Sequence, residues 1–123
     1  MKELSIVLRE DRTTYEPGEE LEGVASWNLK AAPKVAEVRL FWFTSGKGTR
    51  DAEVIDAVRF ELPGSEDTRK FSFQLPGFPL SFSGKLITLT WAVELVIEPK
   101  RDAVLIEFEM APGGREIRID EPA

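Results

Sequence analysis

The sequence contains neither cysteine nor histidine among its 123 residues. Disulfide bonds, thiolate or histidine metal sites, histidine general bases and cysteine nucleophiles are therefore all excluded. A catalytic serine would need a lysine or a carboxylate as its base, and the chain has no G-x-S-x-G or S-x-x-K motif. Ser81 and Ser83, between Pro79 and Gly84, are interpreted as turn residues. The sequence predicts a protein that is not an enzyme and uses no cofactor.

Metal ions could only be held by carboxylate oxygens. The acidic clusters lack the alternating Asp/Asn spacing and central glycine of a calcium loop. Solvated charge at strand ends is the simpler interpretation for these clusters, which are Glu10-Asp11, Glu19-Glu20 with Glu22, and Glu66-Asp67. No metal site is expected.

Long apolar runs and excess positive charge are also missing. The net charge is −6, which disfavours nucleic acid and anionic membranes as partners because both require clustered lysine and arginine. Thr88, Thr90 and Glu94 interrupt the best candidate for a membrane span, so no transmembrane segment is expected. The first twelve residues lack the apolar stretch of a signal peptide, and the absence of cysteine fits a reducing compartment. We expect a cytoplasmic protein.

What the sequence does contain is alternation of apolar and polar residues, with no helical stripe. Turn signals recur at intervals of about 8–12 residues, as in sandwiches and barrels. A chain of this length suits one core. The sequence therefore predicts a single domain, residues 1–123, with an all-β, two-sheet antiparallel, immunoglobulin-like sandwich of about eight strands. The expected strands begin near Leu4, Leu21, Val35, Val54, Phe71, Ile87, Val104 and Ile117.

The face of each strand follows from the same alternation. The segment from Val35 to Thr44 is apolar on both faces, which is typical of a central strand that is covered on both sides. The next strand is expected to direct Val54, Val58, Phe60 and Leu62 inward, and the charged residues 65–69 are expected to form a turn. The predicted aromatic core consists of Trp27, Trp42, Phe60, Phe71, Phe73, Trp91 and Phe108.

Asp56 interrupts the apolar face of that fourth strand, and two interpretations remain open. It could be an inward acid that is paired with Glu94, in a glycosidase or a carbohydrate-binding module built on a sandwich. Alternatively, it could mark a β-bulge, or an edge strand whose charge blocks pairing with another chain. Burying an unpaired carboxylate is costly, which favours the second interpretation.

Two sequence blocks resemble a known family. The first is Y-E-P-G-E-E-L-E-G-V from Tyr15 to Val24. The second is F-S-F-Q-L-P from Phe71 to Pro76, followed by Pro79, Ser81, Phe82, Gly84 and Trp91-Ala92-Val93. These residues are similar to the arrestin-type β-sandwich domain, which arrestins share with bacterial sporulation-control proteins.

Arrestins pair two such sandwiches, whereas this chain has room for one, so the polar core between the arrestin lobes is not carried over. The resemblance implies a non-enzymatic adaptor or scaffold domain without a cofactor, and a protein as its partner.

The residues from Gly77 to Gly84 are the first candidate for a partner-binding surface. Phe78, Leu80 and Phe82 are large apolar side chains in an irregular segment. If two of them point outward they form an exposed patch of the kind that marks interaction sites. The alternative is that they close one end of the sandwich.

Lys47 and Arg50 form a second candidate, a basic loop tip on an acidic protein. Binding could also use an edge strand, because an open sandwich presents unpaired backbone groups to a partner or to a second copy. A structural homo-oligomer subunit is therefore a further alternative to the adaptor function.

Overall fold

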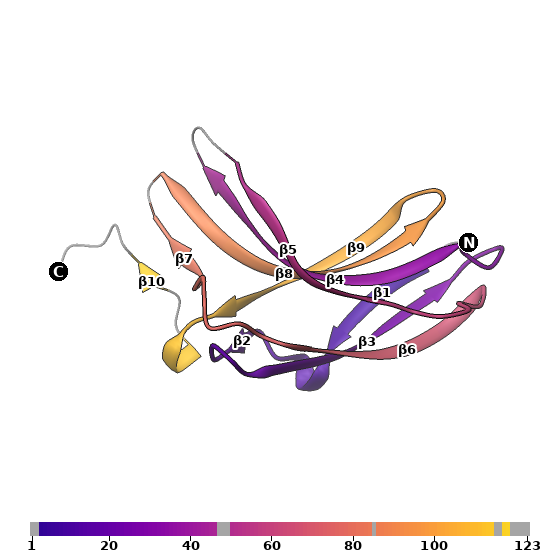
Figure 1. The fold of residues 1–123 in the computed structure, drawn as a ribbon, viewed down its shortest axis with the longest axis horizontal. Coiled ribbons are helices and arrows are strands. Elements are labelled where there is room, and N and C mark those ends of the chain that lie inside the picture. The colour runs from indigo at the N-terminus through magenta and orange to yellow at the C-terminus, as the bar shows by residue number, and fades with distance from the viewer. Residues whose placement is uncertain (1–2, 47–49, 85, 115–116, 119–123) are drawn as a thin grey trace.

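The structure, a computed structural model, describes residues 3–46, 50–84, 86–114 and 117–118. These residues form strands, with two short 3₁₀ turns (Figure 1). The elements are β1 (Glu3–Leu8), η1 (Arg9–Asp11), β2 (Thr14–Tyr15), β3 (Glu20–Asn28), β4 (Val35–Gly46), β5 (Ala52–Arg59), β6 (Glu66–Gln74), β7 (Phe82–Ser83), β8 (Ile87–Glu98), β9 (Asp102–Met110), η2 (Pro112–Gly114) and β10 (Ile117–Arg118).

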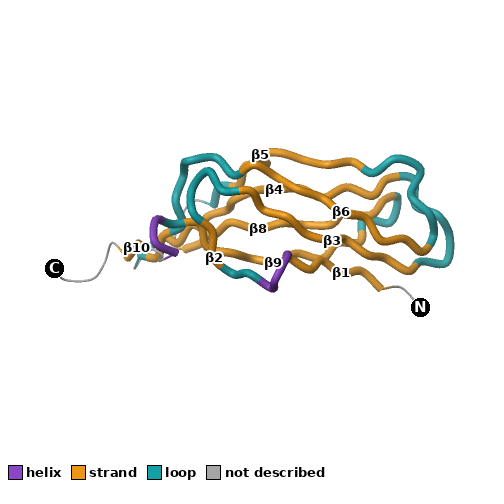
Figure 2. Tube along the Cα trace, turned by 90° about the horizontal axis from the view of Figure 1, so that it is seen from below, coloured by secondary structure: helices purple, strands orange, loops and turns teal. Residues whose placement is uncertain are grey.

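The strands form two facing sheets, which confirms the predicted all-β sandwich (Figures 1 and 2). The small sheet has the order β1-β3-β6. The large sheet runs β10-β7-β8-β4-β5, and β9 also pairs with β8. Every pair between long strands is antiparallel, but the two-residue strands β2 and β10 lie parallel to β9 and β7. Parallel pairing occurs at these two places because each short strand reaches its neighbour through a long connection rather than a hairpin.

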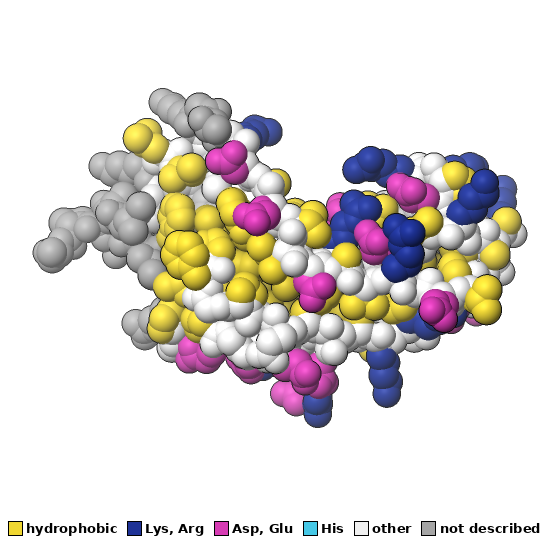
Figure 3. Space-filling view, in the orientation of Figure 1, with side chains coloured by type: hydrophobic (Ala, Val, Ile, Leu, Met, Phe, Trp, Pro, Cys, Tyr) yellow, Lys and Arg dark blue, Asp and Glu magenta, His cyan; other side chains and the backbone are white. Residues whose placement is uncertain are grey.

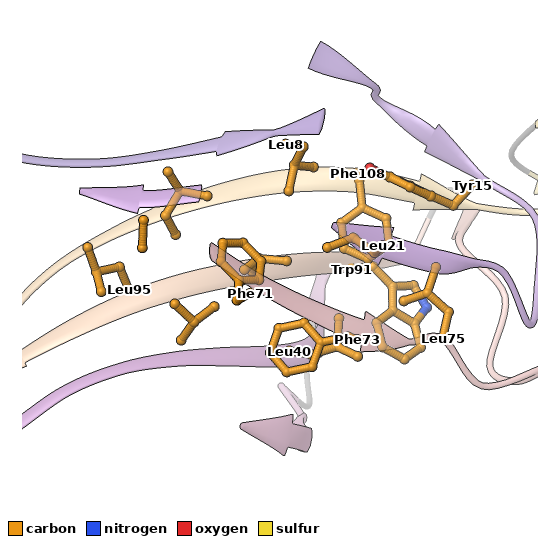
Figure 4. Close-up of a cluster of buried hydrophobic side chains, with 14 of the residues drawn as sticks. Leu8, Tyr15, Leu21, Leu40, Phe71, Phe73, Leu75, Trp91, Leu95 and Phe108 are labelled. Carbon is orange, nitrogen blue, oxygen red and sulfur yellow. The ribbon is translucent and has the colours of Figure 1, made fainter. Parts of the chain in front are cut away.

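Alternate side chains from the two sheets meet in an aromatic core (Figure 4). Six of the seven predicted core aromatics are buried, and Trp42 packs against them while remaining half-buried. The Phe108 ring contacts Tyr15 edge-on at 5.3 Å between centroids and lies 6.1 Å from Trp91. The Trp91 indole N–H donates to the backbone oxygen of Pro79 at 2.8 Å, so burial leaves this donor satisfied. Each such ring stabilises the fold by roughly 1.5–3 kcal/mol.

The first resemblance block forms the turn into β3. Gly18 adopts a left-handed backbone with φ 81°, and the backbone N–H of Glu19 donates to the oxygen of Glu16 at 3.1 Å. The Glu19 carboxylate accepts two hydrogen bonds from the Arg12 guanidinium, which lies over the ring of the buried Tyr15. Hydrogen bonds from Arg12 and from the Glu16 N–H lower the pKa of the Glu19 carboxyl. The block therefore fixes the start of β3 against the rest of the fold.

The turn before β6 is shorter than expected. β6 begins at Glu66 rather than near Phe71, so the prediction that residues 65–69 form a turn is wrong. Asp67 accepts hydrogen bonds from the backbone N–H groups of Gly64 and Thr68 and from Arg69, which stabilises the end of the connection formed by residues 60–65. The first five residues of β6 are charged or polar, so the sequence there shows no alternation with apolar residues. In the structure these five residues pair with β3.

Candidate interaction surface

β4 carries apolar side chains on both of its faces. Val38 and Leu40 point into the core and are fully buried. Phe41 and Phe43 project from the opposite, outer face and remain partly exposed, with their ring centroids 5.9 Å apart. β4 is central, between β8 and β5, as predicted. The expectation that both faces are covered is wrong, because among the described elements only the small sheet packs on the large one, and it covers the inner face (Figures 1 and 2).

A β-bulge in β5 adds a third apolar side chain to this outer face. Leu40 pairs with Asp56 but the next residue, Phe41, pairs with Val54, so Ile55 is an extra residue in β5. One extra residue exchanges the faces of all residues beyond it. The prediction that Val54 points inward is therefore wrong. Val54 lies beside Phe41 on the outer face, with 56% of its surface exposed.

We refer to Phe41, Phe43, Val54 and Ala92 together as the Phe41 patch. Ala92 of β8 pairs with Phe41 and belongs to the outer face, yet it has no exposed surface. The large sheet is bent along its strands so that its outer face is hollow (Figure 1). Side chains on the concave side of a bent sheet crowd together, which explains why Ala92 is covered by its neighbours.

A charged cluster follows the Phe41 patch along β4. Glu37 is 8% exposed, and its carboxylate accepts hydrogen bonds from Arg39 Nε at 2.5 Å and from Arg59 Nε at 3.2 Å. Burial raises the pKa of Glu37, but the hydrogen bonds from the two arginines outweigh burial, and the pKa is lowered. The carboxylate is thus ionised and paired, which holds both guanidinium groups at the outer face.

The predicted contact loop is divided by the fold. Phe78 is 79% exposed, whereas Leu80 and Phe82 are partly buried and pack against the core. Phe82 lies in β7 and pairs with Leu89 of β8. Two of the three side chains therefore help to close one end of the sandwich, and Phe78 alone of the three projects into solvent.

The predicted basic loop tip lies in the β4–β5 connection. Arg50 is exposed and precedes Asp51, whose backbone oxygen accepts a hydrogen bond from Thr44 N–H at 2.8 Å. Lys47 lies outside the described residues. The role of both as contact residues stays a prediction.

The proposed carboxylate pair does not form. Asp56 pairs with the inward-facing Leu40, whereas Glu94 pairs with Arg39 on the outer face, and β4 separates the two acids. Asp56 is exposed on the edge strand β5, directly after the bulge, and accepts a hydrogen bond from the Ala57 N–H. The geometry matches the interpretation of Asp56 as a bulge and edge residue.

Two further kinds of feature are absent from the described part of the chain. Residues 3–46, 50–84, 86–114 and 117–118 contain no group of three or more acidic side chains placed to hold a metal ion. Across these ranges, no helix is long and apolar enough to cross a bilayer.

Sequence reasoning missed Phe41, Phe43 and Val54 as surface residues. The signal was present in the run Leu40-Phe41-Trp42-Phe43, since a strand that is apolar on both faces needs a cover on both faces. The bulge that brings Val54 to the outer face has no comparable signal other than Asp56.

Comparison with known proteins identifies the fold. The sporulation control protein Spo0M from Bacillus subtilis aligns with 89% of this chain at a TM-score of 0.64 and 20% sequence identity. This chain covers 49% of that protein, which is about half of its length. The arrestin-like resemblance predicted from the sequence is confirmed at the level of the fold.

Looser alignments connect the chain to a β-glucosidase from Listeria innocua. In complex with isofagomine, that enzyme aligns over 95% of this chain and 16% of its own length, with a TM-score of 0.47 and 13% identity. An alignment this loose supports no functional inference. No protein-family model matches the sequence, and no curated protein matches it either.

Proposed function

We propose that this protein is a non-enzymatic interaction domain of the arrestin-like type, an adaptor or scaffold, which binds a partner protein through the Phe41 patch. One observation carries the proposal: residues 40–43 of the central strand β4 are apolar on both faces, and among the described elements none packs on the outer one. A partner that covered the exposed parts of the Phe41 and Phe43 rings would gain roughly 25 cal/mol for each Å² of apolar surface that it buried. A partner protein on the outer face supplies the missing cover.

The chemistry around the patch suits a protein surface. Protein interfaces combine an apolar centre with a polar rim, and they are enriched in aromatic residues and arginine. Here Phe41 and Phe43 provide the centre, while Arg39 and Arg59, held by Glu37, provide charged groups beside it. The structural relative Spo0M is a sporulation control protein, and a regulatory role of that kind also favours an interaction domain over an enzyme.

Substitution of Phe43 by serine tests the proposal. Phe78→Ser is the matched control, because it removes an aromatic side chain that is more exposed and lies away from the outer face of β4. Affinity capture from native lysate should recover a defined protein with the wild type and with Phe78→Ser, and should lose it with Phe43→Ser. Isothermal titration with the purified partner should then show affinity lowered at least tenfold by Phe43→Ser.

The opposite pattern would contradict the proposal. If Phe78→Ser abolishes capture while Phe43→Ser retains it, the contact surface is the β6–β7 connection. If the purified protein instead turns over a substrate reproducibly, the protein is an enzyme.

A homo-oligomer is the second candidate, and one edge strand favours it. β6 pairs with β3 over nine consecutive residues without a bulge, and among the described strands it has no neighbour on its other side. Such an edge can accept a strand from a second copy. Sedimentation equilibrium across a hundredfold range of concentration tests this candidate, and a monomer throughout would exclude it.

A further inference from the structure

A pocket at one end of the sandwich lies away from the Phe41 patch. Two segments line it, the β3–β4 connection from Leu29 to Lys34 and the residues around the β8–β9 turn from Ile97 to Asp102. Its volume is about 510 Å³, within the range of roughly 300–1,000 Å³ that is usual for small-molecule sites. The β8–β9 turn is at the right-hand end of Figure 1.

The base of the pocket is apolar. Ile97 and Pro33 are buried, and Leu29 is half-buried and packs against the core. These side chains mark the point where the two sheets end and the core reaches the surface. An apolar group entering the pocket would therefore continue the core outward.

The rim of the pocket is positively charged. Lys30, Lys34 and Lys100 are exposed around it, and its lining includes two acids, Glu98 and Asp102. Three cations and two anions give a local charge of +1, on a protein whose net charge is −6. Figure 3 shows that lysine and arginine side chains gather toward this right-hand end of the molecule.

Arg101 adds a further positive charge beside the pocket. Arg101 directly follows Lys100 and is exposed. The field at the mouth of the pocket therefore favours an anion.

The two walls are held in place before any ligand arrives. The backbone N–H of Lys34 donates to the oxygen of Glu98 at 3.0 Å, which joins the β3–β4 connection to the end of β8. At the other end of the connection, the N–H of Leu29 donates to the oxygen of Ser65 at 2.7 Å. A preorganised site loses less conformational entropy on binding.

We propose that this pocket binds a small organic anion with an apolar body, such as a medium-chain carboxylate. The body would lie on Ile97, Pro33 and Leu29, and the carboxylate would face the three lysines. Both halves of the ligand are required, because the base offers apolar contact and the rim offers charge.

Octanoate and its neutral counterpart octanamide form a matched pair of probes. Octanoate titrated into ¹⁵N-labelled protein should produce saturable shifts in the NMR signals of residues 29–34 and 97–102. Octanamide should bind at least threefold more weakly, because it keeps the apolar body and loses the charge. Raising the salt concentration to 0.5 M should reduce the difference between the two probes through screening.

Charge variants locate the site. The double substitution Lys30→Gln with Lys34→Gln should weaken octanoate binding by about two- to fivefold per lysine, the range of exposed ion pairs. Lys70→Gln is the control, since Lys70 lies in β6 of the other sheet and should leave binding unchanged. Ala32→Trp fills the pocket from an exposed position of its lining and should abolish binding of both probes.

Several outcomes would overturn the proposal. These are equal affinity for octanoate and octanamide, shifts centred on the Phe41 patch, or unchanged affinity in the double lysine variant. Binding of an acidic peptide in the absence of any octanoate shift would also overturn it, in favour of a protein ligand. Phe43→Ser should leave octanoate binding intact, so failure of this proposal and failure of the adaptor function can be told apart.

Discussion

The ring of Phe71 occupies the space that a side chain on Gly23 would need. A β-carbon built on Gly23 would lie 2.6 Å from Cζ of Phe71 and 2.8 Å from the backbone oxygen of Val7. Gly23 lies in the middle strand of the small sheet, paired with Leu8 on one side and Phe71 on the other. The glycine of the first resemblance block is therefore required by packing, because it lets an aromatic ring approach the backbone of β3 closely.

Replacement of Gly23 by alanine should lower the free energy of unfolding by about 1–3 kcal/mol, because the extra methyl group overpacks a tight contact. The backbone oxygen of Val7 cannot move away without disturbing β1. Urea denaturation followed by tryptophan fluorescence measures the change. Gly77→Ala is the control, since a β-carbon there meets nothing within 4 Å, and it should not destabilise the protein. Equal stability of the two variants would show that the contact relaxes freely.

Trp91→Ala should cost about 3–5 kcal/mol, as other large-to-small core substitutions do. Trp91 has no exposed surface, and its loss would also leave the Pro79 oxygen without its indole donor. Thermal and urea denaturation measure the effect, and Phe78→Ala, at an exposed aromatic, should change stability by less than about 0.5 kcal/mol. A loss below about 1 kcal/mol for Trp91→Ala would mean that the two sheets do not meet at this ring.

Asp67 should make stability depend on pH in the acid range. Hydrogen bonds from Arg69, Gly64 N–H and Thr68 N–H lower its pKa from 3.8 to about 2. Because the pKa in the folded state is below the unfolded value, ionised Asp67 stabilises the fold above about pH 4, and this contribution is lost as the pH falls from 3.8 toward 2.

The difference in unfolding free energy between the wild type and Asp67→Asn should therefore be largest at neutral pH and should shrink by pH 3. Urea titrations at pH 7, 5, 4 and 3 measure it. In an Arg69→Gln background the same difference should be smaller at neutral pH, since the largest cause of the shift is removed. A difference that stays constant with pH would contradict the role given to this carboxylate.

The inward faces of most strands could be predicted because a strand with one buried face has a period of two. Leu21, Ala25 and Trp27 in β3 point inward as predicted, and so do Leu89, Trp91 and Val93 in β8. In both strands, side chains of one parity meet the facing sheet along the whole length. Hydrophobic burial alone then determines the register.

The alternation of apolar and polar residues gave wrong predictions at two places, an extra residue within β5 and the connection that follows this strand. Ile55 is the extra residue in β5, and nothing in its side chain distinguishes it from a paired neighbour. The prediction that Leu62 points inward is also wrong, because it lies in a turn with φ 47° and is 93% exposed. Leu62 lies in the connection between β5 and β6, outside both strands, so alternation within a strand does not apply to it.

The candidate site was harder to predict than the fold because exposure depends on what lies above a face. Phe78, Leu80 and Phe82 look equivalent in the sequence, yet two of them pack against the core. Phe41 and Phe43 look like core residues, yet the described part of the chain leaves their side of the sheet open. Sequence alternation identifies the two faces of a strand but does not identify which neighbours cover them.

The bulge at Ile55 also means that the register of β5, rather than its hydrophobicity, determines which of its side chains reach the outer face. Without the bulge, the register set by Leu40 and Asp56 would place Ile55 opposite Phe41 and Val54 opposite the inward-facing Trp42. Deleting Ile55 would keep Val54 opposite Phe41, so the extra residue serves to move β5 from one register to the other rather than to supply a side chain to the outer face.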